Sequence, residues 1–159
     1  MFRIGLGHDT HRLGPGDGLV IGGITIPHDR AAIGHSDADV LLHAITDAIL
    51  GAAALGDIGE MFPDTDAANK GKDSTVMLAA AVARLHQAGW HVGNVDITVI
   101  TQRPKIGPHR AAIRARLAEL LDVSDTEVFV KGKTNESMGW IGREEGLAVM
   151  ATATVLPRR

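Results

Sequence analysis

The stretch SDADVLLHAITDAILGAAALG, residues 36–56, contains the clearest helical pattern in the chain. Its apolar side chains recur at intervals of three and four residues, which places them on one face of an α-helix. They are Leu41, Ala44, Ile45, Ala48, Ile49 and Ala52. Ser36 or Asp37 can cap the first turn, and we expect the helix to end near Gly56.

Strand patterns flank this helix on both sides. Alternating apolar residues bounded by glycine and proline turns predict strands at 2–13, 19–27, 94–101, 126–131 and 147–156. The second of these is expected to bend at Gly22 and Gly23. Further helices are predicted from Ser74 to Gly89 and from Pro108 to Leu121. This order indicates one domain, residues 1–159, of the α/β (α+β) class, a two-layer sandwich with helices on one face of a mixed sheet of four to five strands.

Composition limits the classes of function. The chain has 16 Lys and Arg against 19 Asp and Glu and lacks an extended basic run, which argues against a nucleic-acid partner. Cysteine is absent, so a transition-metal site must use histidine nitrogen and carboxylate oxygen. No apolar run reaches the roughly 20 residues of a membrane span, and the first residues lack a signal-peptide pattern, so we expect a cytoplasmic protein without a membrane partner.

Asp9 and His11 lie two residues apart in the first predicted strand, so their side chains share one face. A polar row on the helix is spaced to lie opposite its apolar face, and consists of Ser36, Asp39, His43 and Asp47. If this row faces the strand, His43 joins Asp9 and His11 as the third ligand of a zinc site, with one position open. Asp39 or Asp47 would then orient the His43 ring. The alternative is a surface Asp–His pair with His43 on a solvated helix face, and spacing alone favours that alternative.

His35 and Ser36 come just before the helix, where backbone N–H groups attract anions. They are therefore candidates for holding a phosphate beside the metal. For Ser36 alone, the role of a helix cap is the more usual one.

The loop at 56–73 is longer than an ordinary connection, which is typical of functional or disordered loops. Its acidic residues suit the hydroxyl groups of a polyol substrate. The sequence Asp64-Thr65-Asp66 is equally typical of a solvated turn, and we favour the turn from the residues alone.

Two later loops also have polar or rigid sequences. PKIGP, 104–108, offers backbone groups to a base ring, or else stiffens the approach to the next helix. In KTNE, 133–136, Lys133 and Thr134 suit phosphate oxygens and Glu136 suits Mg²⁺ bound together with phosphate. An ordinary polar loop is the alternative for KTNE.

Taken together, several motifs resemble one known family. They are GHDTHRL at 7–13, GHSDADVLLHAITDAILGAAALGDIGEMFPDTD at 34–66, NVDITVI at 94–100, RPKIGPH at 103–109 and KTNESMGWIGREEGLA at 133–148. In this order they resemble the 2-C-methyl-D-erythritol 2,4-cyclodiphosphate synthases, over essentially the whole chain. The resemblance implies a homotrimer with active sites between neighbouring subunits. Each site would convert a cytidine-diphosphate methylerythritol 2-phosphate to a cyclic diphosphate and CMP, in non-mevalonate isoprenoid synthesis.

The resemblance also implies roles for individual residues. Asp9, His11 and His43 match zinc ligands, Glu136 matches the ligand of a second ion, Mg²⁺ or Mn²⁺, and His35 and Thr134 match residues that steady the transition state. The implied substrate contacts are Asp9, His11, His35, Ser36, Asp57, Ile58, Gly59, Phe62, Pro63, Asp64, Thr65, Asp66, Thr101, Pro104, Lys105, Ile106, Gly107, Lys133, Thr134, Asn135, Glu136, Trp140 and Arg143. A cavity on the threefold axis is implied too, with an isoprenoid diphosphate as its ligand.

Three positions depart from the family's usual pattern. Lys133 stands where many members have threonine, His8 where the residue is often hydrophobic, and Glu144 where Gly-Arg-Gly-Glu-Gly has its middle glycine. Two other functions fit the same residues: a metal-dependent phosphohydrolase, which would activate water, and a trimeric scaffold with a structural metal.

Overall fold

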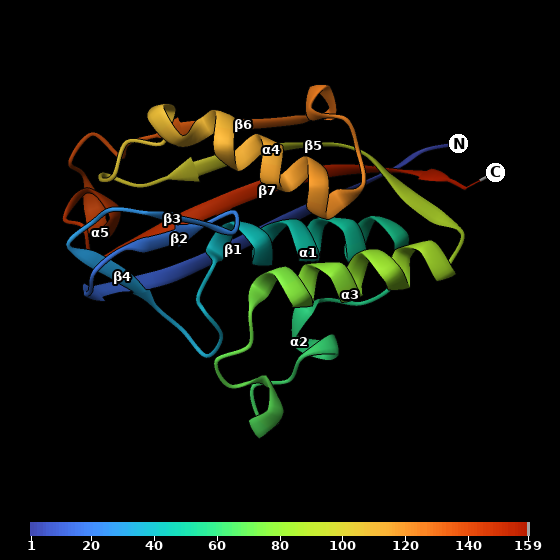
Figure 1. Ribbon diagram of the computed structural model, residues 1–159, viewed down its shortest axis with the longest axis horizontal. Helices are drawn as coiled ribbons and strands as arrows, with labels where there is room; N and C mark the ends of the chain where they lie inside the picture. Colours follow the sequence, from blue (N-terminus) through green and yellow to red (C-terminus); the bar gives the residue numbers. More distant parts are fainter. Residues whose placement is uncertain (159) are drawn as a thin grey trace.

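The computed structural model describes residues 1–158 as a curved mixed sheet with helices packed against it (Figure 1). The sheet strands are β1 (Arg3–Pro15), β4 (Arg30–Ile33), β5 (Trp90–Ile100), β6 (Val128–Lys133) and β7 (Gly146–Pro157). Their order is β4-β1-β7-β5-β6, and only the β5–β6 pair is parallel. The helices are α1 (Val40–Ala53), α2 (Ile58–Met61), α3 (Ser74–Gln87), α4 (Arg110–Leu121) and α5 (Gly139–Gly142). The predicted mixed α/β architecture with a five-stranded sheet is confirmed.

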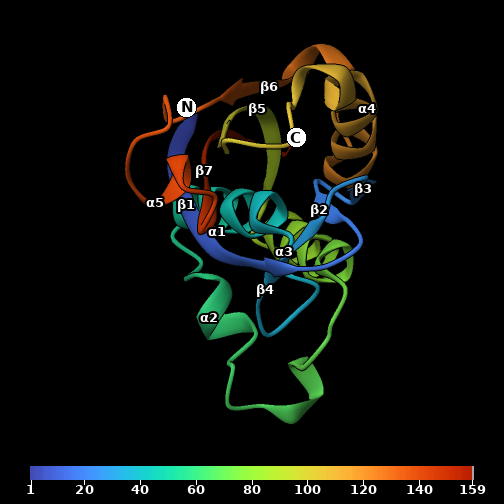
Figure 2. The same ribbon diagram turned by 90° about the vertical axis from the view of Figure 1, so that its left-hand side faces the viewer.

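Helices α1, α3 and α4 lie on the same side of the sheet, and α5 lies on the other (Figure 2). The core between the two layers is aliphatic, as the composition predicts. Its sheet side includes Val95, Ile97, Val130, Val149, Ala151 and Val155, all essentially inaccessible to solvent. None of the helices in residues 1–158 has the length and apolar character needed to cross a membrane.

Strand β1 lies directly against α1 because its inward positions begin with glycines. A Cβ atom at Gly7 would lie 1.8 Å from the carbonyl oxygen of Ala44 and 2.8 Å from the amide nitrogen of Ala48. Any side chain there would push strand and helix apart. Asp9 and His11 are the next residues on this face of β1, so the close contact also sets their distance from α1.

Helix α1 begins later than predicted. Its N-cap is Asp39 rather than Ser36 or Asp37, since the Asp39 carboxylate accepts hydrogen bonds from the backbone N–H groups of Leu41 and Leu42. Both bonds are 3.1 Å long. Asp39 is fully buried, so the prediction that it belongs to a row facing away from the core is wrong. Its carboxylate already accepts two of the N-terminal N–H groups of α1, so these two are not available to a phosphate.

The segment 19–27 forms a separate hairpin instead of one bent strand. Its two strands are β2 (Leu19–Ile21) and β3 (Ile24–Ile26). Gly22 and Gly23 have φ angles of +64° and +74°, which suits the tight turn that joins two such strands. Their N–H groups donate to Asp39 at 2.9 and 2.6 Å, so this one carboxylate attaches the hairpin to α1.

The long loop at 56–73 has structure of its own. It contains α2 and a short 3₁₀ helix, Ala67–Asn69, each capped by an aspartate side chain: Asp57 and Asp66. The loop is attached to the residues before α1, because Gly71 N donates to His35 O at 2.7 Å and Asp37 N donates to Lys72 O at 3.2 Å. It is therefore fixed beside the start of α1.

Candidate metal centre and substrate cleft

Asp9 and His11 from β1 meet His43 from α1. The three potential ligand atoms all lie within 4.8 Å of one another. Asp9 Oδ2 is 3.1 Å from His11 Nε2 and 3.0 Å from His43 Nδ1, and the two ring nitrogens are 3.3 Å apart. The predicted meeting of these three side chains is confirmed.

The donor set suits a divalent cation. One nitrogen of each imidazole ring and one Asp9 carboxylate oxygen converge on a small volume, with the two ring nitrogens 3.3 Å apart. Two imidazoles and one carboxylate are ligands that zinc accepts, with a position left for a further ligand. Burial alone would raise the pKa of Asp9, but hydrogen bonds with His11 and His43 outweigh it and hold this pKa well below its ordinary value. The carboxylate is therefore ionised, as a metal ligand must be.

The other ring nitrogen of His43 is fixed by hydroxyl groups. Its Nε2 lies 2.9 Å from Ser74 Oγ and 3.0 Å from Ser36 Oγ. Ser74 Oγ in turn donates to the Asp37 carboxylate, so it accepts a hydrogen from Nε2. This arrangement fixes the ring so that His43 Nδ1 points toward Asp9 and His11, the direction from which it would bind a metal.

Neither of the predicted orienting residues contacts this ring. The Asp39 carboxylate instead accepts N–H groups of the β2–β3 hairpin. The Asp47 carboxylate accepts the N–H of Ile58 at 2.8 Å, which fixes the start of α2. Ser74 was not predicted because a serine at the start of a helix has the pattern of a cap. The cap itself is Asp73.

A cavity of about 250 Å³ opens beside the three ligands. Its lining includes many of the predicted substrate contacts, namely Asp9, His11, His35, Ser36, Ile58, Gly59, Phe62 and Asp64. Asn69 and Met77 line it as well and were not predicted. Asp57, Pro63, Thr65 and Asp66 belong to the same loop but do not line the cavity.

A second cavity, of about 290 Å³, lies between the loop after β5 and the end of β6. The predicted residues that line it are Thr101, Pro104, Lys105, Ile106, Gly107, Lys133 and Thr134, joined by Gln102, Pro108, Arg110 and Gly132. It shares no lining residue with the first cavity. Glu136 is exposed nearby and its Oε1 accepts from Thr134 Oγ1 at 2.9 Å. Within residues 1–158, Glu136 belongs to no cluster of metal-capable side chains.

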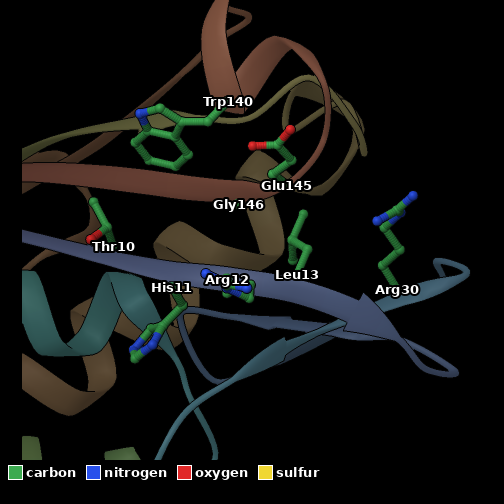
Figure 3. A pocket seen from close by; sticks show the side chains of 8 residues that line it. All are labelled: Thr10, His11, Arg12, Leu13, Arg30, Trp140, Glu145 and Gly146. Carbon is green, nitrogen blue, oxygen red and sulfur yellow. The ribbon is translucent and has the colours of Figure 1, made fainter.

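A third cavity, of about 480 Å³, lies beside β1 and α5. Figure 3 shows Trp140 and His11 on opposite sides of the β1 and β7 ribbons, with Arg12 and Arg30 also at this cavity. Arg143 lines none of these three cavities, and instead its Nε donates to Glu145 at 2.7 Å.

Comparison with known proteins decides the family. The model of the YgbB family matches residues 2–156. This chain belongs to the YgbB family. Among its curated relatives, a 2-C-methyl-D-erythritol 2,4-cyclodiphosphate synthase from Gemmatimonas aurantiaca is 72% identical over 98% of this chain and 94% of the relative. A synthase of the same name from Cupriavidus metallidurans is 54% identical over 98% of this chain and 93% of the relative.

Solved structures of YgbB relatives have the same fold. The bifunctional IspDF from Campylobacter jejuni superimposes with a TM-score of 0.94 at 39% identity, covering 98% of this chain and 42% of that one. IspF from Plasmodium falciparum, described as a complex with CDP, has a TM-score of 0.87 at 34% identity and covers 99% of this chain and 97% of its own. The resemblance to the synthases is thus confirmed for the chain as a whole.

Proposed function

We propose that this chain converts 4-diphosphocytidyl-2-C-methyl-D-erythritol 2-phosphate to 2-C-methyl-D-erythritol 2,4-cyclodiphosphate and CMP. It would act in the cytoplasm as a phosphorus–oxygen lyase of the non-mevalonate (MEP) pathway to isoprenoid precursors. The observation that carries this proposal is the meeting of Asp9, His11 and His43 beside a cleft, in a chain 72% identical to a synthase.

We assign a Zn²⁺ ion to Asp9, His11 and His43, and a Mg²⁺ or Mn²⁺ ion to Glu136 together with substrate phosphates. Such ions, when bound, offset the negative charge of phosphate oxygens. The converging ring nitrogens and carboxylate oxygen, and the fixed ring of His43, support the first assignment. The exposed carboxylate of Glu136 supports the second, because it is accessible to a ligand.

The reaction needs no strong general base. A phosphate monoester has a second pKa of about 6, so the 2-phosphate is already ionised near neutral pH. One of its oxygens bonds to the β-phosphorus while the bond to the bridging oxygen breaks, and CMP leaves with that electron pair. The task of the protein is to bring two anionic groups into line. We assign to His35 and Thr134 the steadying of the transition state.

The substrate would lie across the two separate cavities. We assign residues 57–59 and 62–66 to the methylerythritol and diphosphate, and residues 101–107 with Lys133 to the cytidine. The loop before β7, with Asn135, Trp140 and Arg143, would supply further contacts. The CDP complex of the Plasmodium falciparum relative supports a cytidine nucleotide as ligand.

We propose a homotrimer with each active site between two subunits. The two cavities share no lining residue within one chain, which supports an arrangement in which a neighbouring copy brings the two linings together. The face of the sheet away from α1 supports this assembly, because Ile4, Leu6 and Met150 are 61%, 62% and 43% exposed there. Such a trimer would enclose the axial cavity, for which an isoprenoid diphosphate stays the predicted ligand.

Phosphorus NMR of the protein with the cytidine-diphosphate substrate, Zn²⁺ and Mg²⁺ tests the reaction. We expect CMP and the two coupled signals of a cyclic diphosphate, with loss of both on chelation. His43→Ala should abolish them, and His86→Ala, at the far end of α3, should not. Inorganic phosphate as product would indicate the hydrolase instead. Unchanged substrate under all metal conditions would refute the proposal and favour the scaffold.

A further inference from the structure

The ion pair of Arg103 and Glu144 joins two loops that are far apart in the sequence. Arg103 precedes Pro104, which lines the second cavity, and Glu144 follows α5. The Nε and Nη2 atoms of Arg103 donate to the two carboxylate oxygens of Glu144, both at 2.7 Å. A two-point contact of this kind fixes orientation as well as distance. The pair therefore restrains the direction in which the 101–107 loop leaves β5.

Glu144 has a backbone conformation that favours glycine. Its φ is +58°, in the left-handed region that is costly for a residue with a Cβ atom. This chain carries a glutamate at the position despite that cost. The side chain is 18% exposed, and its hydrogen bond with Arg103 lowers its pKa below the ordinary value. Arg30 also holds this residue, donating from Nη1 to the Glu144 carbonyl at 3.2 Å.

The residue next to Arg103 makes a second attachment. The Gln102 side-chain oxygen accepts the N–H of Ser137 at 3.2 Å, at the start of the segment that leads into α5. Thr101 is buried, and its hydroxyl donates to the Arg103 carbonyl at 2.6 Å. The 101–107 loop is thus bonded to residues on both sides of α5: to Ser137, which precedes α5, and to Glu144, which follows α5.

We propose that Glu144 is a positioning residue, which through Arg103 holds the 101–107 loop in the conformation that binds the cytidine nucleotide. This inference rests on the proposed function, since it takes the second cavity to be the cytidine site. Loss of the pair would lower the fraction of molecules with the loop in place, and the apparent dissociation constant would rise by the same factor. For a partly exposed ion pair we expect an increase of roughly two- to fivefold.

Titration calorimetry with CDP in the presence of Mg²⁺, together with thermal unfolding, separates positioning from a structural role. Glu144→Gly removes the pair but places glycine at a positive φ, so the unfolding midpoint should hold or rise while CDP binds more weakly. Glu144→Gln keeps the side-chain length without the charge and should also weaken binding. The control is Glu119→Gln, which breaks the Arg116–Glu119 pair of α4, where Nη1 and Oε2 are 2.6 Å apart. It should leave the affinity for CDP unchanged.

Three results would overturn the inference. Equal CDP affinity of Glu144→Gly and the unmodified protein would show that the pair does not position the loop, and would leave the proposed function intact. Weaker binding with an equally lowered unfolding midpoint would reveal a general structural role. Failure of the unmodified protein to bind CDP would remove the cytidine site, and with it both this inference and the nucleotide part of the proposed function.

Discussion

Replacing Gly7 by alanine tests the close contact between β1 and α1. The new methyl carbon would start 1.8 Å from the Ala44 carbonyl oxygen, so the two must separate by about 1.6 Å to reach the shortest ordinary contact, 3.4 Å. Both close neighbours are helix backbone, so no side-chain rotation can relieve the overlap. Overpacking in a core costs about 1–3 kcal/mol. Because a paired strand or a helix must move here, we expect a loss of about 3 kcal/mol or more in the free energy of unfolding.

Urea unfolding followed by circular dichroism measures this loss, and the chain offers a matched control. A Cβ atom added to Gly51, on α1, would meet nothing within 4 Å beyond its own stretch of helix. Gly51→Ala should therefore stabilise the protein by about 0.5 kcal/mol through helix propensity. Gly7→Ala should also weaken zinc binding, since the displaced strand carries Asp9 and His11. A Gly7→Ala protein within about 0.5 kcal/mol of the unmodified one would refute the reasoning.

Three further predictions concern the groups around the metal ligands. Ser74→Ala removes one of the two hydroxyl partners of His43 Nε2 and leaves only Ser36, so it should weaken zinc binding by about 10- to 100-fold, measured by competition with a chromophoric chelator. Ser124→Ala, in a distant cap, should have no effect. Asp39→Ala leaves four backbone N–H groups without an acceptor and should lower the free energy of unfolding, measured in urea, by about 2–4 kcal/mol. Asp39→Asn keeps one side-chain oxygen and should lower it less. Removal of metal by a chelator should abolish CMP release without changing the circular dichroism spectrum, because the core is independent of the three ligands.

Periodic patterns allowed the layers of the fold to be predicted. The spacing of apolar residues in α1 identifies one buried face, but the helix is buried on most of its sides, since Leu42 and Leu50 are inaccessible as well. The alternation in β1 places Asp9 and His11 together. Spacing alone could not predict that Asp9 and His11 meet His43. The contact depends on how closely two backbones approach, and that distance follows from Gly7 and from the backbone of the facing helix.

Several of the wrong predictions concern residues at or beyond the ends of the periodic segments. Asp39 has the spacing of a helical row, but it is the cap and its side chain turns back to the helix amides. Helical periodicity does not apply to a cap, because its backbone is not helical. Ser74 reaches His43 across 31 residues of sequence, and no local pattern reports such a contact.

The residues just before α1 serve several parts of the molecule at once. His35 and Asp37 hold the long loop, Ser36 contacts His43, and Asp39 caps the helix and holds the hairpin. Selection for folding and selection for activity therefore act on the same side chains at Ser36, Asp37 and Asp39, whereas His35 holds the loop through its backbone carbonyl. In a saturation mutagenesis screen, the substitutions tolerated for expression and those tolerated for catalysis should nearly coincide at 36, 37 and 39. On β1 the two sets should diverge at Asp9 and His11, where a variant can fold well and still be inactive.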